Sequence, residues 1–523
     1  MLDNYGAKYK PSAVSMGLVN AKGKIKAEDK RPDLHVNGNI EELIFKDYAY
    51  RNLSFSGHCS GREYGIQLNH DDANAALALQ SVIHLGENSK HLYCSIRANG
   101  INPHAMNLTK GFKGERFDAD IEAELSGTNI DNLQGDLSIN GLKAVSDSLG
   151  TCDAGNILVS FSPQDNGKAV RIESQALNAT VKGQFKWKNL GTVFQQIASN
   201  YLPKIFRSPD KVFSDNVAFN LEMQDTTLVQ RLTGQTFSIP EKATISGRMN
   251  GKYNLLQMSA DIPQLVYGGE TLKKINLQMQ SSSEMLQTSL NLQRMMKNNP
   301  IDLGIDAYTG YDKIRATLNW DNGLQPKQSG LIDATGIFFN GRDGKLALHT
   351  KLASSDIVVS DTTWTLHPST VEYHDGVVDV IGFRLSQADR YLNINGRASK
   401  EENDSLIVEL NKINLEYIFQ MINFNAVEFA GNATGHVYAK QVMKKPIADA
   451  YLTVGDFTFN KGKMGSLDVH GNWGDYGNSI YLNARIQDPE AQHNTTVRGT
   501  ITPGRGPRGG LDLSVNTKRI NLY

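Results

Sequence analysis

Apolar and polar residues alternate along most of this 523-residue chain. In the stretch 480–487, Ile480, Leu482 and Ile486 alternate with polar residues such as Asn483 and Arg485. A period of two places every second side chain on the same face of a β-strand, so this stretch predicts a strand with one apolar and one water-facing side. The same pattern returns from one end of the chain to the other and predicts a mainly β protein.

The clearest alternations define one predicted apolar face. Stretches 181–187, 391–398 and 450–454 share the pattern of 480–487. The candidate groove-lining residues are Val181, Phe185, Trp187, Leu392, Ile394, Leu452, Val454, Ile480, Leu482 and Ile486. Because a soluble monomer rarely exposes an apolar face of this extent, we expect the face to hold something apolar, and acyl chains are the best candidates.

Asn-Gly pairs separate many of the alternating stretches. They occur at 37–38, 99–100, 140–141, 166–167 and 340–341. Such pairs supply the positive φ angles of tight hairpin turns, so each is predicted to join two antiparallel strands. The predicted fold is an elongated, curled, largely antiparallel β-sheet, or β-groove, with a few short amphipathic helices.

Two stretches have the spacing of a helix. From Leu190 to Phe206, apolar residues recur every three or four positions, and Pro203 is expected to kink or split the helix. The apolar stripe favours packing on the sheet, while Lys204 and Arg207 near its end leave a bilayer surface as an alternative. A second, shorter helix is predicted for 415–422.

The distribution of Gly and Pro residues along the chain indicates how the domains are organised. The 47 Gly and 15 Pro residues are spread along the chain instead of being gathered into linkers, which predicts one continuous, elongated domain. Its parts are β-groove segments at 1–188, 209–355 and 356–523 and an amphipathic helix at 189–208. The 54 Lys and Arg residues against 55 Asp and Glu give a net charge of −1, which does not favour nucleic acid as a partner.

Three motifs resemble catalytic, cofactor-binding or metal-binding sites, but the sequence around each of them does not fit such a site. The Gly-His-Cys-Ser-Gly stretch at 57–61 mimics a nucleophile elbow, but no α/β pattern surrounds it and a hairpin loop is expected. The dinucleotide-like glycine spacing at 504–509 precedes a strand, so no helix N-terminus is available for a pyrophosphate. His91 and Cys94 have no second ligand pair at zinc-site spacing. We therefore predict no catalytic residues, no metal and no cofactor.

A series of short motifs occupies the C-terminal third. They are Trp364-Thr-Leu-His-Pro, Gly376-Val-Val-Asp-Val-Ile-Gly-Phe-Arg-Leu, Ile394-Asn-Gly-Arg-Ala-Ser, Ile413-Asn-Leu-Glu-Tyr-Ile-Phe, Gly431-x-x-x-Gly435, Ala450-Tyr-Leu-Thr-Val and Phe457-Thr-Phe-Asn-Lys-Gly-Lys-Met-Gly-Ser-Leu-Asp-Val. Their order and spacing resemble the TamB-like translocation and assembly module family, a branch of the AsmA-like envelope proteins. The match is best over Asp356 to Tyr523.

This resemblance implies a gutter-shaped sheet in the periplasm of a Gram-negative cell, anchored in the inner membrane. It implies phospholipid acyl chains, the inner membrane and an outer-membrane BamA-like barrel protein as partners. No stretch reaches the ~18 to 20 apolar residues of a membrane span. We therefore expect the anchor to lie outside this sequence, which would be an interior segment of a longer protein.

Three functions fit these expectations. The first is non-enzymatic conduction of phospholipid between the inner and outer membranes, in support of outer-membrane biogenesis. The second is a scaffold or chaperone for assembly or secretion of outer-membrane β-barrel proteins, in which the groove or a strand edge pairs with a client. The third, a β-solenoid adhesin or carbohydrate-binding protein, is less favoured because solenoids need a constant repeat length and the strand spacing here is irregular.

Overall fold

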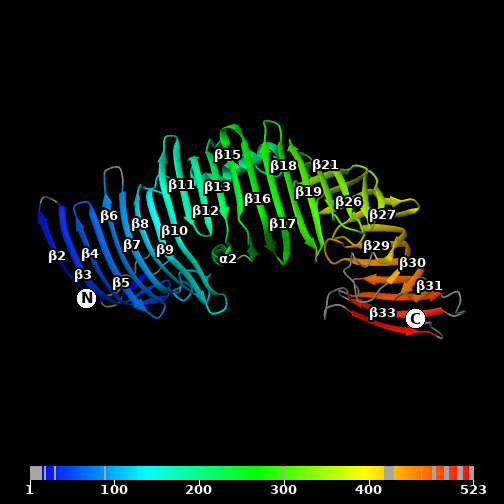
Figure 1. Ribbon diagram of the computed structural model, residues 1–523, viewed down its shortest axis with the longest axis horizontal. Helices are drawn as coiled ribbons and strands as arrows, with labels where there is room; N and C mark the ends of the chain where they lie inside the picture. The colour runs from blue at the N-terminus through cyan, green and yellow to red at the C-terminus, as the bar shows by residue number, and fades with distance from the viewer. Residues whose placement is uncertain are drawn as a thin grey trace. The chain divides into compact units, whose positions relative to one another are not determined.

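The computed structural model describes residues 14–16, 19–28, 31–86, 90–234, 236–296, 299–416, 429–460, 462–473, 479–487, 494–502 and 510–517 (Figure 1). These residues form mainly β-strands, and neighbouring strands pair in antiparallel fashion. The predicted fold class, a mainly β protein built from a curled, largely antiparallel sheet with short helices, is confirmed.

The chain divides into two compact units. The first comprises Met1–Ile197, Ser208–Ser283 and Leu290–Met295, and the second comprises Ala198–Arg207, Glu284–Ser289 and Met296–Tyr523. Helix α1 (Leu190–Tyr201) and strand β18 (Leu286–Met296) contribute residues to both.

The first unit contains strands β1 to β17 and, apart from α1, the short helices between them. Its elements are β1 (Val14–Met16), β2 (Val19–Glu28), β3 (Arg31–Phe45), β4 (Tyr48–Ser60), β5 (Glu63–Asp72), β6 (Ala75–Leu85), β7 (Lys90–Ile101), β8 (Glu115–Ser126), β9 (Gln134–Ser146), β10 (Gly150–Gln164), β11 (Gly167–Ser174), β12 (Leu177–Gln184), the 3₁₀ turn η1 (Trp187–Asn189), β13 (Asn216–Met223), α2 (Thr227–Thr233), β14 (Phe237–Ser238), β15 (Ala243–Asn250), η2 (Gly251–Tyr253), β16 (Leu255–Tyr267) and β17 (Glu270–Ser281).

The second unit continues the same construction. Its strands are β19 (Asn299–Gly310), β20 (Lys313–Asp321), β21 (Ser329–Asn340), β22 (Leu346–Leu352), β23 (Ser355–Val359), β24 (Thr362–Leu366), β25 (Ser369–His374), β26 (Val377–Gln387), β27 (Arg390–Ala398), β28 (Ser405–Asn414), β29 (Phe429–Lys440), β30 (Ile447–Phe459), β31 (Gly462–Trp473), β32 (Ile480–Gln487), β33 (Asn494–Thr502) and β34 (Gly510–Asn516). The predicted boundary between residues 355 and 356 falls inside β23, which pairs with β21 before it and β24 after it, so the sheet continues through this point.

Strand registers in the first unit separate an apolar face from a polar one. We call a row of residues paired across neighbouring strands a rung. One apolar rung crosses β7–β13 and β15–β17 and consists of Cys94, Ala123, Leu137, Val159, Ile172, Ala179, Leu221, Ile245, Ala260 and Leu277. The adjacent rung, on the opposite face, runs from Glu124 and Asp136 through Arg171 to Gln278. The alternation in the sequence thus becomes two chemically distinct faces.

Three of the five Asn-Gly pairs do not form the predicted hairpin turns. Asn37-Gly38 lies inside β3, and Asn99-Gly100 and Asn140-Gly141 lie inside β7 and β9. Gly100 and Gly141 have φ angles of 61° and 60°, and the pairing register shifts beside both of them. A positive φ angle also accommodates the extra residue of a β-bulge, so the same dipeptide can bend a long strand instead of ending it. The pairs at 166–167 and 340–341 do lie in hairpin connections, as predicted.

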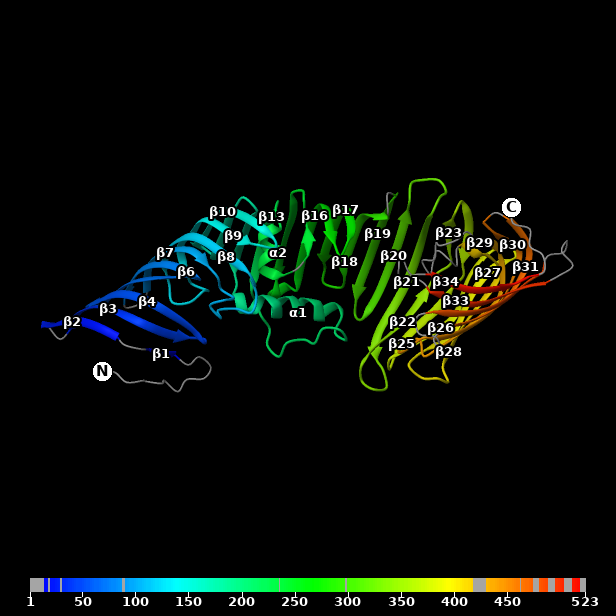
Figure 2. The ribbon, with the colours of Figure 1, turned by 90° about the horizontal axis from the view of Figure 1, so that it is seen from below.

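Helix α1 packs against protein along its apolar stripe. The helix, which is labelled α1 in Figure 2, ends at Tyr201, two residues before Pro203. Val193, Ile197 and Tyr201 are at most 1% exposed. Gln196 fixes the helix further, because its amide nitrogen donates to the carbonyl oxygen of Gly251 at 2.8 Å. Val193, Ile197 and Tyr201 therefore pack on protein, as favoured from the sequence, whereas Phe194 and Ile205 of the predicted stripe are 42% and 40% exposed. Only residues 415 and 416 of the second predicted helix are among the described residues.

The contacts of His374 with two aspartates in the β25–β26 hairpin are expected to make the stability of the protein depend on pH. His374 Nε2 lies 2.9 Å from an Asp379 carboxylate oxygen and its Nδ1 lies 3.2 Å from Asp375. Hydrogen bonds to Asp379 and then to Asp375 raise the pKa of His374 above its usual value. A raised folded-state pKa stabilises the fold below the unfolded pKa of about 6.5, and this contribution is lost as pH rises through the folded pKa.

We therefore expect the free energy of unfolding to fall between about pH 6 and about pH 8.5, and to fall less in a His374→Gln variant. Urea unfolding at the two pH values measures the difference. An equal decrease in the free energy of unfolding of the two proteins would show that His374 does not contribute.

Asp379 gives a second pH dependence, in the acid range. Arg397 and His374 lower the pKa of Asp379, so the stability that Asp379 contributes is present above its unfolded-state pKa and is lost as pH falls through its folded-state pKa.

Candidate functional site

An apolar cavity of about 310 Å³ lies on one face of the second unit's sheet. Its lining residues are Leu415, Phe429, Ala450, Leu452, Val454, Phe457, Phe459, Met464, Leu467, Val469, Gly471, Ile480, Leu482, Ala484, Ile486, Thr495, Val497, Ile501, Leu513 and Val515. They come from β29–β34 and from the residue that follows β28. Val515, on the last of these strands, is 52% exposed, so the cavity is open to solvent at this edge.

Strand register explains why this face is continuous and apolar. One rung joins Leu452, Val469, Ala484, Val497 and Val515 across five strands. The neighbouring rung on the opposite face joins Tyr451, His470, Asn483, Arg498 and Ser514 across the same strands. Period-two alternation held in register over five strands therefore creates one apolar wall and another that faces water.

Aromatic side chains and a β-bulge close one end of the cavity. The register between β30 and β31 shifts between Val454 and Phe457. Because of that shift, Val454 and Phe457 are both buried, in a cluster with Met464, although they are three residues apart in one strand. Phe429 stacks on Phe457 with ring centroids 6.0 Å apart. The bulge thus directs a second aromatic group into the apolar face, where uninterrupted alternation would have turned it outward.

Two glycines leave space on either side of Leu482. Leu482 pairs with Gly471 on β31 and with Gly499 on β33. A Cβ atom on Gly471 would lie 3.6 Å from the Ile480 side chain, which is an ordinary contact distance. A Cβ atom on Gly499 would lie 1.9 Å from the carbonyl oxygen of Asp512, so this position must stay a glycine. Leu482 consequently stands without side-chain neighbours in its own rung on the two adjacent strands.

The cavity offers almost no polar chemistry. Thr495 is the single hydroxyl-bearing residue among its lining residues, and it is 5% exposed. Its Oγ1 donates to Thr517 Oγ1 at 2.8 Å, so its one donor hydrogen is already used within the protein. No lining residue carries a charge. Such a surface can bind hydrocarbon through burial alone, without a polar group that would select one orientation of the ligand.

Half of the predicted groove residues line this cavity. They are Leu452, Val454, Ile480, Leu482 and Ile486. Leu392 and Ile394 lie on the same sheet farther from β34, where Leu392 packs on the buried cluster of Trp364, Leu410 and Ile413. Leu452 packs on that cluster too, so Leu392 lies on the same apolar face without lining the cavity.

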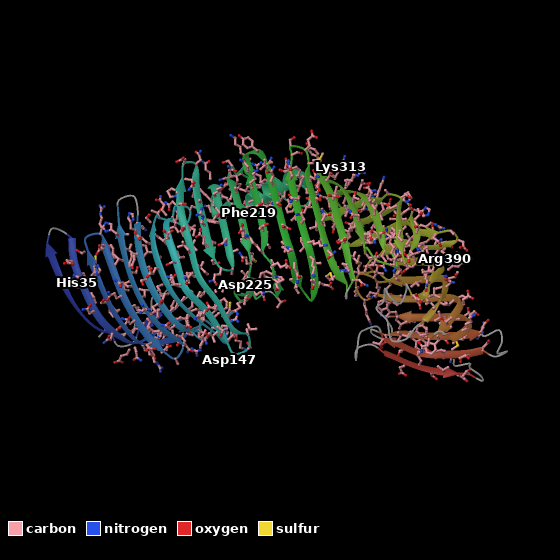
Figure 3. The ribbon with its side chains drawn as sticks, in the orientation of Figure 1. His35, Asp147, Phe219, Asp225, Lys313 and Arg390 are labelled. Carbon is pink, nitrogen blue, oxygen red and sulfur yellow. The ribbon has the colours of Figure 1, made fainter. Side chains whose placement is uncertain are left out.

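The other three predicted residues belong to the first unit. Val181 lies in an apolar rung between Val170 and Phe219, which is labelled in Figure 3. Phe185 and Trp187 follow the end of β12 and pack edge to face, with centroids 5.0 Å apart. The Lys168 ammonium group lies 4.5 Å from the Phe185 ring centroid and 5.6 Å from that of Trp187. The structure therefore gives these two rings a cation–π contact outside the strand pattern.

Sequence analysis missed the aromatic end and the far strands of the cavity. Phe457 and Phe459 fall out of phase with Leu452 and Val454 because of the bulge between them. The positive φ angle of Asp456, 52°, marks the bulge in the structure, whereas the sequence offers only Gly455-Asp456 as a hint. Val497 and Leu513 have the expected alternation, but only the strand pairing shows that they join this cavity.

The other motifs carry no chemistry in the described structure. The stretch 57–61 was predicted as a hairpin loop, but residues 57–60 lie in β4 and pair with both neighbouring strands, and only Gly61, with a φ angle of 59°, lies in the β4–β5 turn. The glycine motif at 504–509 lies outside the described residues. In the described ranges, no three His, Cys, Asp or Glu side chains are grouped so that they could hold a metal ion. No helix of the described part is both long and apolar enough to cross a bilayer.

Comparisons of the chain with protein-family models, curated proteins and solved structures find no match. The resemblance to TamB-like proteins therefore stays a prediction, and the functional argument depends on the cavity and its surroundings.

Proposed function

We propose that the apolar cavity of the second unit binds the acyl chains of phospholipids, and that the protein moves lipid along its apolar face. The observation that carries this proposal is the cavity lining, which contains no charged residue and whose one hydroxyl-bearing residue, Thr495, is hydrogen-bonded within the protein. Hydrocarbon is the ligand chemistry that such a lining accepts without leaving a polar group unpaired.

Energetics favour weak, exchangeable binding. The cavity of about 310 Å³ has room for on the order of ten groups of the size of a water molecule. At about 0.8 kcal/mol for each buried methylene, a chain that fills it gains about 8 kcal/mol. Association costs at least about 4 kcal/mol, which leaves a net affinity near the millimolar range for the cavity alone. A site of this strength holds a lipid briefly and releases it, as transport requires.

The cellular role we propose is passage of phospholipid between the inner and outer membranes of the envelope, in support of outer-membrane biogenesis. The apolar rungs of the first unit support this role, because they present the same chemistry as the cavity. The proposed partners, an inner-membrane anchor region and an outer-membrane BamA-like barrel protein, rest on the sequence resemblance. No step of this role involves catalysis.

Lipid analysis of the purified protein tests the proposal. We expect phospholipid that contacts both the cavity and the adjoining apolar face to be held more tightly than by the cavity alone, to co-purify, and to be identified by mass spectrometry of the organic extract. A fatty acid with an environment-sensitive fluorophore should bind and be displaced by unlabelled long-chain fatty acid, but not by a short-chain one that buries few methylenes. Absence of extracted lipid together with absence of fluorophore binding would contradict the proposal. Co-purification of unfolded outer-membrane polypeptide in place of lipid would support the scaffold function.

A further inference from the structure

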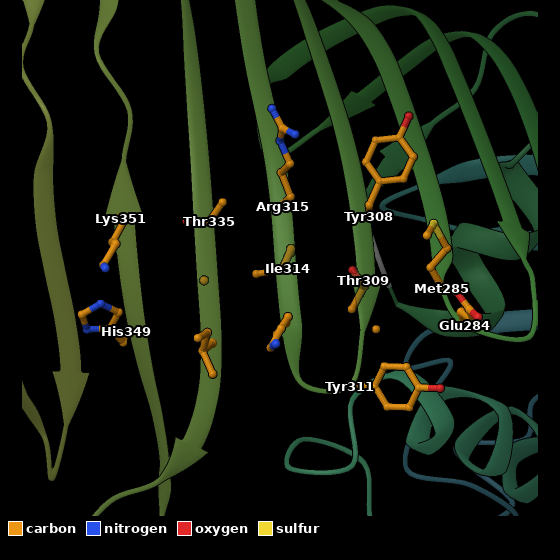
Figure 4. A pocket seen from close by; sticks show the side chains of 14 residues that line it. Glu284, Met285, Tyr308, Thr309, Tyr311, Ile314, Arg315, Thr335, His349 and Lys351 are labelled. Carbon is orange, nitrogen blue, oxygen red and sulfur yellow. The ribbon is translucent and has the colours of Figure 1, made fainter.

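A second hollow, of about 600 Å³, lies over β19–β22 in the second unit (Figure 4). Its side chains come largely from the polar face of the sheet. One rung there consists of Tyr308, Arg315, Thr335 and Lys351, and the next contains Lys313, Ile337 and His349. Figure 4 shows the first rung as a row across four neighbouring strands, and Figure 3 labels Lys313.

Among the residues that the structure describes, the hollow contains both ion-paired and unpaired cationic side chains. Arg315 is paired with Asp333 through contacts of 2.8 Å and 3.4 Å, and His349 is paired with Glu372. Lys313 and Lys351 have no ion pair within the described part of the chain. Glu284, the other carboxylate at the hollow, lies at its edge in the loop after β17. Two ammonium groups are therefore available to an external anion.

The same hollow exposes large amphipathic and apolar side chains. Tyr308, Tyr311, Ile337 and Met285 are between 42% and 70% exposed. Tyrosine combines an apolar ring with a polar hydroxyl group, and lysine an apolar stem with a charged end, so both suit the boundary between water and lipid. Exposed aliphatic side chains beside them can contact the upper part of the acyl region.

A close approach between two backbone segments forms the rim of the hollow. A Cβ atom at Gly310 would lie 2.4 Å from the carbonyl oxygen of Glu284, so the absence of a side chain there lets the loop containing Met285 approach β19. The hollow is thus a shaped surface with a defined wall rather than a chance gathering of exposed lysines on a flat sheet.

We propose that this surface docks on a membrane rich in anionic phospholipids, with Lys313 and Lys351 on the headgroup phosphates and with Tyr311, Met285 and Ile337 at the interface. Charge complementarity selects the anionic membrane, and the exposed tyrosines and aliphatic residues favour a lipid surface over a soluble polyanion. The docking surface uses the face opposite the acyl-binding cavity and is independent of the proposed acyl binding.

Co-sedimentation with vesicles tests this docking. The vesicles contain phosphatidylcholine alone, or phosphatidylcholine with about one third phosphatidylglycerol to supply the negative surface potential. We expect the protein to bind the anionic vesicles only, and binding to weaken as salt screens the charges. A Lys313→Gln, Lys351→Gln double variant should bind about 30-fold more weakly, the loss expected from two lysines at an anionic surface.

Two control variants distinguish docking through Lys313 and Lys351 from a general effect of charge and from acyl binding. A Lys444→Gln, Lys445→Gln variant changes the net charge equally at an exposed turn elsewhere in the same unit and should bind as the unmodified protein does. A Leu482→Asp variant should also keep vesicle binding, which separates this proposal from acyl binding. Equal weakening by both lysine pairs, equal binding to zwitterionic vesicles, or displacement by millimolar inorganic phosphate at constant ionic strength would overturn the docking proposal.

Discussion

Leu482→Asp is expected to abolish binding of the fluorophore-labelled fatty acid, whereas Asn483→Asp leaves it unchanged. Leu482 lines the apolar cavity, and the residues paired with it on the adjacent strands are glycines. A carboxylate at this position has no side-chain partner in its rung and must lose its hydration when an acyl chain enters. The desolvation of an unpaired charge costs several kcal/mol, which is as large as the whole net affinity of the cavity.

The neighbouring substitution provides the matched control. Asn483 is exposed on the opposite face of β32, and its side-chain oxygen accepts a hydrogen bond from Arg498 Nε at 3.2 Å. An aspartate there keeps the acceptor and faces an arginine, so neither the fold nor the cavity should change. Equal binding by the two variants would mean that the cavity is not the acyl site.

An uncharged substitution tests the same cavity independently, in case the Leu482→Asp variant does not fold. Gly471 faces the cavity, and a side chain there begins with ordinary contacts to Ile480 and Ala450. Gly471→Leu should therefore fill space that the acyl chain needs and reduce binding, with thermal stability close to that of the unmodified protein. Undiminished binding in this variant would also contradict the location of the site.

The faces of the strands were predictable because period-two alternation is a local property. Ile480, Leu482 and Ile486 line the cavity, and Asn483 and Arg485 are exposed, as the sequence indicates. A strand only has to be extended for this prediction to hold, whatever its partners are. The stripe of α1 was predictable for the same reason, with a period of 3.6 in place of two.

Bulges and pairing could not be predicted, since they depend on residues far away in the sequence. Asn140-Gly141 has the composition of a hairpin turn, but it lies in the middle of β9 because β8 and β10 pair on either side of it. Phe457 enters the cavity because β30 contains an extra residue relative to β31. Phe185 and Trp187 continue the alternation of β12 after the strand has ended, so their pattern alone suggested a groove position that their contacts with Lys168 do not support.

Replacing Arg231 is expected to cause the largest loss of stability in the first unit. Arg231 lies on α2, and its guanidinium group contacts Glu115 at 3.4 Å, with both side chains no more than 7% exposed. The same group donates to the carbonyl oxygens of Ala144, Leu149 and Gly150 at 2.9 to 3.3 Å. This one side chain therefore joins α2 to β8, β9 and β10, and its partners Glu115 on β8 and Ala144 on β9 are at most 5% exposed.

Arg231→Met removes the cation and leaves Glu115 buried with an uncompensated charge, which costs about 3 to 5 kcal/mol. Urea unfolding monitored by hydrogen exchange in peptides from β8–β10 measures the loss. The control is Arg171→Gln, since Arg171 and Glu173 form a pair 3.6 Å apart in which both side chains are more than half exposed, and loss of such a pair should cost less than about 1 kcal/mol. Adding Glu115→Gln to Arg231→Met removes the stranded charge and should recover part of the loss, because the penalty comes mainly from the unpaired carboxylate and not from the absent helix contact. If the double variant is no more stable than Arg231→Met alone, the carbonyl hydrogen bonds of Arg231, and not its charge, hold α2 in place.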